Sequence, residues 1–154
     1  MSWSTLRAVT HQSAPAPDQV PVVDFLVLGD GSPHLVGNRC TACAATFLER
    51  RNACGACGGT SFTKARLAPR GRVESFTVVH RGAPKQTGPF VSALVRLDDG
   101  AYVTANLLGV PPDPAAVDCT SPVRLRTFAA GRDADGTEAI AFGFAYDRED
   151  TPNP

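Results

Sequence analysis

The chain contains little lysine, few aromatic residues and no long apolar run. Lysine occupies two of the 154 positions, and aromatic residues make up 7% of the sequence. Proteins that bind single-stranded nucleic acid combine a positive groove with exposed aromatic rings, so this composition argues against a nucleic-acid ligand. A membrane span needs about 18 apolar residues, and the sequence has neither such a run nor a basic leader before an apolar segment. We therefore expect a cytoplasmic protein with no membrane contact.

Recognised catalytic motifs are also missing. The sequence holds no G-x-S-x-G nucleophile elbow, no phosphate-binding loop and no paired-carboxylate pattern. His80, beside Arg81, is the obvious candidate acid or base, but a catalytic histidine needs an orienting partner and a substrate pocket. Because the sequence shows neither, we assign no catalytic residue and expect no enzymatic activity from the chain on its own.

What the sequence does contain favours a mainly β protein. It has 14 glycines and 13 prolines, which favours many turns over long helices. Its 43% hydrophobic and 19% charged residues are typical of a globular protein in water. A length of 154 residues suffices for one core, or for two small modules that share a surface.

Four of the cysteines form two C-x-x-C pairs separated by ten residues, Cys40 with Cys43 and Cys54 with Cys57. In a reducing cytosol thiolate–metal bonds persist where structural disulfides do not, so these four residues are predicted metal ligands. Each pair forms a tight knuckle, and two knuckles supply the four corners of a tetrahedron around Zn²⁺. An iron centre of rubredoxin type and a redox dithiol are the alternatives. Four thiolates leave no open coordination position, which favours a structural site.

The residues that follow the pairs differ. Gly58 and Gly59 follow the second pair, where the chain often needs a positive φ. Ala44 follows the first pair, and a left-handed alanine is strained, so we expect that knuckle to differ slightly in shape. The fifth cysteine, Cys119, has no nearby cysteine or histidine and is predicted to be a small buried apolar residue.

After Pro69 the apolar residues alternate with polar ones, which predicts β-strands. Asp99 and Gly100 predict a hairpin turn, and residues 111–122 interrupt the strands with one helical turn. In the last strand four large residues fall on one face: Ile140, Phe142, Phe144 and Tyr146. Five strands are predicted, at residues 72–81, 90–97, 101–109, 123–130 and 138–148. This number and the interruption after the third strand predict an OB-fold barrel.

The predicted fold is therefore mainly β, with an N-terminal rubredoxin-like zinc ribbon followed by a five-stranded OB-fold barrel. Residues 20–28 are apolar and predict a short strand or a docking helix. The predicted organisation is a flexible N-terminal tail at 1–19, a docking segment at 20–35, the ribbon at 36–68, the barrel at 69–148 and a flexible C-terminus at 149–154.

The chain resembles a known family through five segments: PHLVGNRCTAC, RRNACGACGG, GRVESFTVVHR, PFVSALVRLDDG and PVRLRTF. The family consists of zinc-ribbon plus OB-fold proteins associated with acyl-CoA metabolism, long catalogued as a domain of unknown function, and the resemblance covers residues 20–147. It implies a binding and scaffolding subunit that forms a hetero-oligomer with a thiolase-like or lipid-transfer-type enzyme. It also implies a coenzyme A thioester as a ligand of that complex.

Charge is unevenly distributed although the formal net charge is zero. Nine basic residues lie between Arg39 and Lys85, opposed only by Glu49 and Glu74, whereas the chain after Asp133 is mostly acidic. Arginine binds phosphate oxygens in a bidentate fork, so this segment fits the phosphates of coenzyme A. The alternatives are a solvated face or ion pairs with a partner protein.

We predict ligand contacts at Arg50, Arg51, His80, Arg81 and Lys85. The loop at residues 82–89 is the expected contact element, because binding residues are often placed on exposed loops. The function predicted is a non-catalytic accessory subunit of an acyl-CoA enzyme. A single-stranded nucleic-acid-binding module is the alternative, because zinc ribbons and OB-folds also serve that purpose.

Overall fold

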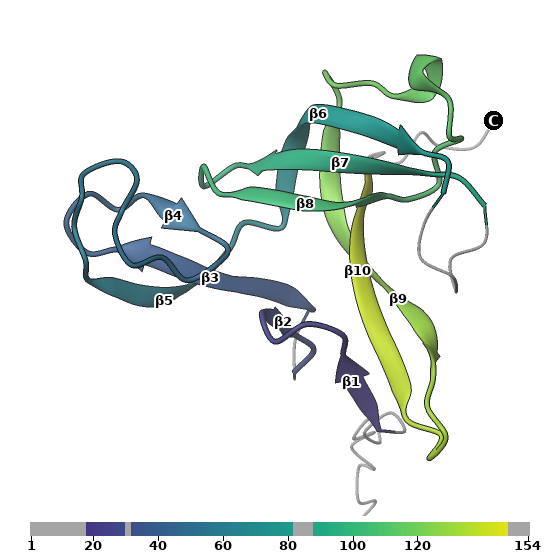
Figure 1. The fold of residues 1–154 in the computed structure, drawn as a ribbon, viewed down its shortest axis with the longest axis horizontal. Coiled ribbons are helices and arrows are strands. Elements are labelled where there is room, and N and C mark those ends of the chain that lie inside the picture. Colours follow the sequence, from purple (N-terminus) through teal and green to yellow (C-terminus); the bar gives the residue numbers. More distant parts are fainter. Residues whose placement is uncertain (1–17, 30–31, 82–87, 148–154) are drawn as a thin grey trace, which may run out of the picture.

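The computed structural model describes residues 18–29, 32–81 and 88–147, and these form an almost entirely β protein (Figure 1). The predicted flexible termini, apart from Asp18 and Gln19, and Lys85 with most of the predicted contact loop lie outside the described residues. No helix among the described residues has the length and hydropathy needed to cross a membrane.

Five strands close into a barrel. They are β6 (Arg70–Val79), β7 (Phe90–Leu97), β8 (Tyr102–Leu107), β9 (Pro122–Arg132) and β10 (Glu138–Tyr146). The ring runs β6, β7, β8, β10, β9 and returns to β6, and each pairing is antiparallel except the parallel contact of β8 with β10. This order is the OB-fold that the sequence predicted.

The barrel core consists of the apolar residues that alternate along each strand. On β7 every second residue is at most 2% exposed: Val91, Ala93, Val95 and Leu97. Phe144 of β10 is fully buried, and Ile140 on the same face is 7% exposed. Phe142 and Tyr146 on that face of β10 are half-buried, so the core takes one full face of β7 and part of one face of β10.

Strand β6 contains a bulge that the alternation did not reveal. The register with β7 shifts between Val73 and Ser75, so Glu74 is an extra residue in the ladder. Before the bulge Gly71 and Val73 are buried, whereas after it the half-buried positions include Phe76. A bulge bends a strand, and the first strand of a small barrel must bend to pair with neighbours on both sides.

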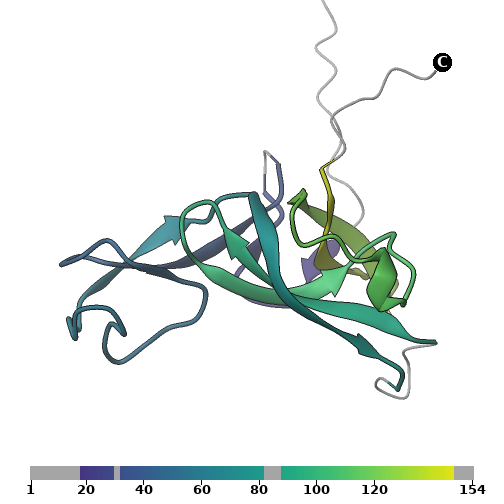
Figure 2. The same cartoon turned by 90° about the horizontal axis from the view of Figure 1, so that it is seen from above.

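The ribbon is a small sheet built around β3 (His34–Cys40). Strand β5 (Phe62–Arg66) pairs along one edge of β3, and β4 (Thr46–Phe47) pairs at the other edge. Strand β2 (Leu26–Val27) pairs with the beginning of β3. The ribbon projects sideways from the barrel (Figures 1 and 2).

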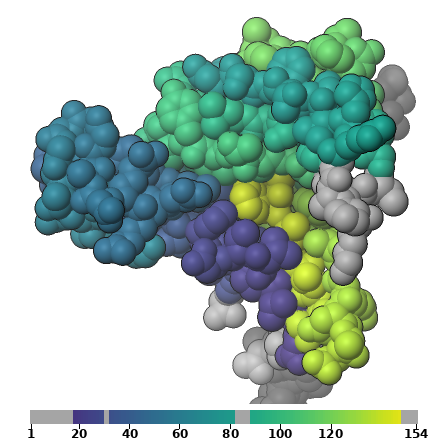
Figure 3. Space-filling model, viewed as in Figure 1, coloured from purple at the N-terminus to yellow at the C-terminus, as the bar shows by residue number. Residues whose placement is uncertain are grey.

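Residues 18–29 pack between the two modules (Figure 3). Strand β1 (Gln19–Pro21) runs parallel to β10, and the backbone N–H of Val22 donates to the carbonyl of Ile140. The Phe25 ring meets the Phe142 ring edge-on at a centroid distance of 5.8 Å. Of the two predicted forms, the apolar segment thus adopts short strands rather than a helix.

The segment between β8 and β9 contains one 3₁₀ turn, η1 (Pro114–Ala116), where the sequence predicted a helical turn. The carboxylate of Asp113 caps it by accepting from the backbone N–H of Ala115. Cys119 in the same segment is exposed, so the prediction of a buried cysteine is wrong. The segment runs over the barrel surface, where Val117 packs against the core and Cys119 faces away from it.

Candidate metal centre and the surfaces around it

The two C-x-x-C pairs fold into knuckles with the same hydrogen bonds. In the first, the backbone N–H of Ala44 donates to the carbonyl of Cys40 at 3.0 Å. In the second, the backbone N–H of Gly58 donates to the carbonyl of Cys54 at 2.8 Å. Both residues have positive φ, 62° at Ala44 and 75° at Gly58. The left-handed alanine is confirmed, but the hydrogen-bond pattern of its knuckle is unchanged.

The four cysteine sulfurs form one cluster. All four Sγ atoms lie within 4.8 Å of one another. The distances are 3.7 Å between Cys40 and Cys57, and 3.6 Å between Cys43 and Cys54. A tetrahedral zinc with Zn–S bonds of about 2.3 Å separates its sulfurs by about 3.8 Å, so the cluster has the size that Zn²⁺ requires.

At Gly59 the backbone passes close to two of the sulfurs. The N–H of Gly59 points to the Cys57 sulfur at an N···S distance of 3.4 Å. A Cβ atom at Gly59 would lie 3.3 Å from that sulfur and 3.4 Å from the sulfur of Cys40. Glycine therefore allows the backbone to approach two of the candidate ligands closely.

The clustered thiols influence one another's ionisation. Burial raises the pKa of the Cys54 thiol, but hydrogen bonds from backbone N–H groups outweigh it and lower the pKa to about 7. At Cys57 the backbone N–H of Gly59 lowers the pKa, whereas hydrogen bonds with Cys43 and Cys40 outweigh it and raise the pKa to about 12. A divalent ion would hold all four sulfurs as thiolates at neutral pH.

An aromatic pair lies in the ribbon beside the knuckles. The rings of Phe47 and Phe62 meet edge-on with centroids 6.3 Å apart. The guanidinium carbon of Arg51 lies 4.6 Å from the centre of the Phe47 ring, within the range of a cation–π contact. The pair links β4 to β5, the two strands that pair with β3.

The predicted ligand-binding residues fall in two separate places. Arg50 and Arg51 are exposed in the loop after β4 of the ribbon, whereas His80 and Arg81 directly follow β6. Strand β6 starts near the ribbon and ends at the opposite side of the barrel (Figures 1 and 2). The structure does not bring these two pairs together, and their role in ligand binding stays a prediction.

A groove of about 810 Å³ separates the ribbon from the barrel. Phe47 and Leu48 line it from the ribbon, and Tyr102 and Thr104 line it from β8. Phe25, which precedes β2, lines it as well. No pattern in the sequence indicated this groove, because its walls come from segments that are about 55 residues apart along the chain.

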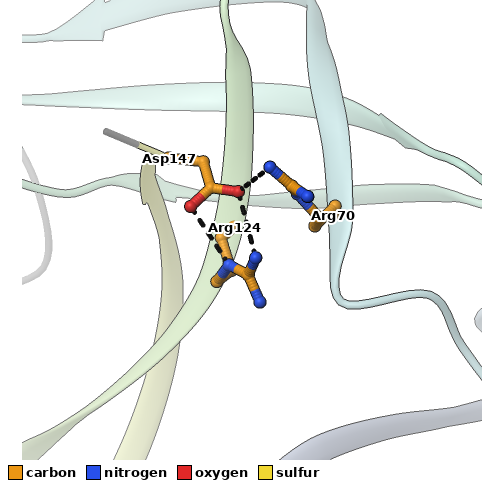
Figure 4. A network of polar contacts seen from close by, with 3 residues as sticks. All are labelled: Arg70, Arg124 and Asp147. Carbon is orange, nitrogen blue, oxygen red and sulfur yellow. Dashed lines mark hydrogen bonds and ion pairs between the residues drawn. The ribbon is translucent and has the colours of Figure 1, made fainter. Parts of the chain in front are cut away.

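One ion-pair network was also missed. The Asp147 carboxylate, whose side chain is 7% exposed, accepts two hydrogen bonds of 3.2 Å from Arg124 and pairs with Arg70 (Figure 4). These hydrogen bonds and the two cationic charges hold the pKa of Asp147 below its usual range. The network joins β6, β9 and the end of β10 where the barrel closes, so its role is structural.

Two family models match the chain in sequence. The rubredoxin-like zinc ribbon domain of ChsH2 matches residues 30–63, and the C-terminal OB-fold domain of ChsH2 matches residues 65–128. The chain is 28% identical over 116 residues to a DUF35 domain-containing scaffold protein of Methanocaldococcus jannaschii, covering 73% of this chain and 79% of that one.

Two further relatives are a subunit of a thiolase and a chain of a solved aldolase structure. The benzoylsuccinyl-CoA thiolase subunit BbsA of Thauera aromatica is 26% identical over 113 residues, covering 73% of this chain and 76% of that subunit. A chain of the solved Ltp2-ChsH2(DUF35) aldolase is 29% identical with a TM-score of 0.57, covering 73% of this chain and 84% of that chain. This chain therefore belongs to the DUF35 family, whose ChsH2-type members join a rubredoxin-like zinc ribbon to an OB-fold domain.

Proposed function

We propose that this chain is a non-catalytic accessory subunit that binds a thiolase-like, lipid-transfer-type partner and helps to bind its acyl-CoA substrate. The observation that carries the proposal is the match, over both modules, to a chain of the Ltp2-ChsH2(DUF35) aldolase. A second relative is named as a subunit of a thiolase. A likeness that spans the ribbon and the barrel together favours a shared way of assembling over a shared fold alone.

The metal centre supports a structural role. The four cysteine sulfurs of Cys40, Cys43, Cys54 and Cys57 would hold Zn²⁺, and the ion would supply binding free energy to a ribbon with few buried side chains. With four thiolate ligands the ion keeps no position for water or substrate. The cluster therefore favours a scaffold over a catalytic zinc site.

The candidate acid or base has no catalytic surroundings among the described residues. The His80 side chain is exposed, and no side chain of residues 18–29, 32–81 or 88–147 forms a hydrogen bond with it. A general acid or base needs an oriented imidazole and an adjoining pocket. This arrangement favours chemistry on the partner, with this chain contributing to binding.

The experiment that tests the proposal is an affinity purification of the tagged chain from its native lysate, with mass spectrometry of what co-elutes. We expect a thiolase-like protein in near-stoichiometric amount. The same eluate is assayed for RNA and DNA. Recovery of nucleic acid without an acyl-CoA enzyme would contradict the proposal and favour the nucleic-acid alternative.

Binding of the thioester is tested on the purified complex by titration calorimetry with coenzyme A. The paired changes Arg50→Ala with Arg51→Ala, and His80→Ala with Arg81→Ala, separate the two places that carry predicted ligand contacts. Loss of an arginine that contacts phosphate weakens binding by at least about tenfold. An unchanged affinity in both double variants would remove these residues from the ligand site.

A further inference from the structure

Strand β8 is paired on both sides over only part of its length. It pairs with β7 throughout, from Tyr102 to Asn106. Its contact with β10 is restricted to Asn106 and Leu107, because β10 continues away along β9 and takes β1 as its neighbour instead. The other edge of β8 from Tyr102 to Ala105 therefore has no strand beside it among the described residues.

The hydrogen bonds to β7 show which backbone groups point to this open edge. The N–H of Leu97 donates to the carbonyl of Ala101, and in an antiparallel ladder such pairs alternate with pairs that point outward. Val103 therefore bonds to β7, whereas the N–H and C=O groups of Tyr102 and Thr104 point away from it. The same alternation directs Asn106 toward β10, in agreement with its observed pairing.

This open edge lies in the groove between the barrel and the ribbon. Tyr102 and Thr104 line the groove, and the Tyr102 side chain is 48% exposed. Phe47 and Leu48 line it from the ribbon. The groove thus combines main-chain donors and acceptors on β8 with an apolar wall opposite, which are the two features that recognise an added strand.

Two other open strand edges among the described residues carry features that discourage pairing. Strand β1 contains Pro21, and β5 carries Lys64 and Arg66. Proline and charged residues at an edge prevent the addition of further strands. Residues 102–105 of β8 have no proline, no charge and no shift of register. Among the described residues, β6 from Ser75 to Val79 also has β7 as its one neighbour and carries no proline or charge, but it does not line the groove. The β8 edge is therefore an unguarded edge that also lies at a groove.

One charged side chain beside the groove, that of Glu49, has no polar partner among the described residues. The carboxylate of Glu49 lines the groove and forms no ion pair or hydrogen bond with any described residue. The nearby Arg51 guanidinium stacks on Phe47 instead. A basic residue of an incoming chain would therefore find an unpaired negative charge at the border of the groove.

We infer that the β8 edge at Tyr102–Thr104 is a docking site for an extended segment of the thiolase-like partner, which adds as a strand between the barrel and the ribbon. Every second side chain of the added segment is apolar and contacts Phe47 and Leu48. A basic residue of the same segment pairs with Glu49. The inference rests on the proposed function for the identity of the partner. A volume of about 810 Å³ would also suit a small molecule, but only a strand uses the open main-chain groups.

The first test is hydrogen exchange, resolved to single amides, on the unmodified chain alone and in the complex purified from lysate. We expect the amides of Tyr102 and Thr104 to exchange at least about tenfold more slowly in the complex, because they become donors to the added strand. The amide of Val103 already bonds to β7 and serves as the internal control, with little change.

The second test compares two substitutions at one position. Thr104→Pro removes the outward N–H and places a ring in the path of the added strand, while the bonds between β7 and β8 do not use that N–H. Thr104→Ala removes the side chain and keeps the N–H. We expect the proline variant to bind the partner at least about tenfold more weakly and the alanine variant to bind within about threefold of the original.

The outcomes separate this inference from the proposed function. A complex that forms but leaves Tyr102 and Thr104 unprotected would overturn the β8 site and leave the accessory role intact. Protection by coenzyme A thioester alone, or protection that rises with the concentration of the free chain, would assign the edge to a small molecule or to a second copy. If no thiolase-like protein is recovered, the proposed function fails and this inference fails with it.

Discussion

The tip of the ribbon, residues 40–66, and the barrel are stabilised by different interactions. From Cys40 to Arg66 the buried residues are two of the cysteines, Cys40 and Cys54. In the barrel, by contrast, apolar residues from all five strands pack into one core, with Val95 and Phe144 fully buried. A segment that buries so little apolar surface cannot offset its conformational entropy by packing, and a metal ion bound by the four cysteines would supply the missing free energy.

The boundary between the two means of folding lies inside the ribbon. Leu35 at the start of β3 and Leu67 after β5 are 1% and 2% exposed, and both belong to the barrel's core cluster. The base of the ribbon is therefore stabilised by apolar packing. At the tip the cluster of four cysteines takes the place of such packing. Variants that affect one region and spare the other test this division.

The largest effect is expected from Cys54→Ser. Loss of one ligand should release the metal and unfold the ribbon tip, since structural zinc contributes on the order of 10 kcal/mol of binding free energy. Metal content by atomic emission should fall, while circular dichroism keeps most of the barrel signal. Cys119→Ser is the matched control and should retain the metal. A Cys54→Ser protein with unchanged metal content would contradict the ligand assignment.

Phe144→Ala is expected to affect the barrel. Removing a fully buried phenylalanine leaves a cavity and should lower the free energy of unfolding by about 3–5 kcal/mol, measured by denaturant titration. Phe128→Ala on the neighbouring strand, where the side chain is 37% exposed, should cost much less. The folded fraction of both variants should keep one metal per chain. Loss of metal from folded Phe144→Ala protein would argue against two separate means of folding.

Ala44→Gly is expected to stabilise the ribbon tip. Alanine at a φ of 62° is strained by about 1 kcal/mol, and glycine removes that strain while adding freedom to the unfolded chain, so the net gain is below this value. Competition with a chelator should show slower or weaker metal release. The reverse change in the other knuckle, Gly58→Ala, should promote release. If both variants released the metal equally readily, the left-handed backbone at these positions would not contribute to the stability of the knuckles.

The smallest effect is expected from the pH dependence of the Asp147 network. The folded-state pKa of Asp147 lies below its unfolded value of about 3.9, so the network contributes stability above that pH and loses it as the pH falls through the folded pKa. Asp147→Asn should flatten the pH dependence of the thermal midpoint below pH 4, and Arg124→Gln should do the same. An unchanged acid slope in both variants would contradict the role of this ion pair.

Several features of the fold could be predicted because they depend on nearby residues. The cysteine spacing predicted the four-sulfur cluster, since each knuckle closes within a few residues. The alternation of apolar residues after Pro69 predicted the strands, and the apolar face of β7, with Val95 and Leu97, is buried. The predicted hairpin turn at Asp99 is present, and its carboxylate also accepts from the backbone N–H of Ala68 at 2.7 Å.

Other features could not be predicted because they depend on segments that are distant in sequence. The exposure of Cys119 follows from the course of a surface segment, whereas the lack of a nearby cysteine or histidine suggested a buried residue. The basic residues counted between positions 39 and 85 do not form one patch. Arg51 lies in the ribbon, whereas Arg81 follows β6, which crosses the barrel and ends away from the ribbon. Charge counted along a chain does not report distance in space.

The sequence by itself determined the cluster of four cysteines and the strand pattern, because cysteine spacing and alternation are local and follow from backbone geometry. The resemblance of five segments indicated the family. Only the tertiary structure decided the bulge at Glu74, the pairing of β1 with β10, the Asp147 network and the open edge of β8. Each of these depends on the register at which the barrel closes. Closure joins strands that are distant along the chain, and no short pattern contains that information.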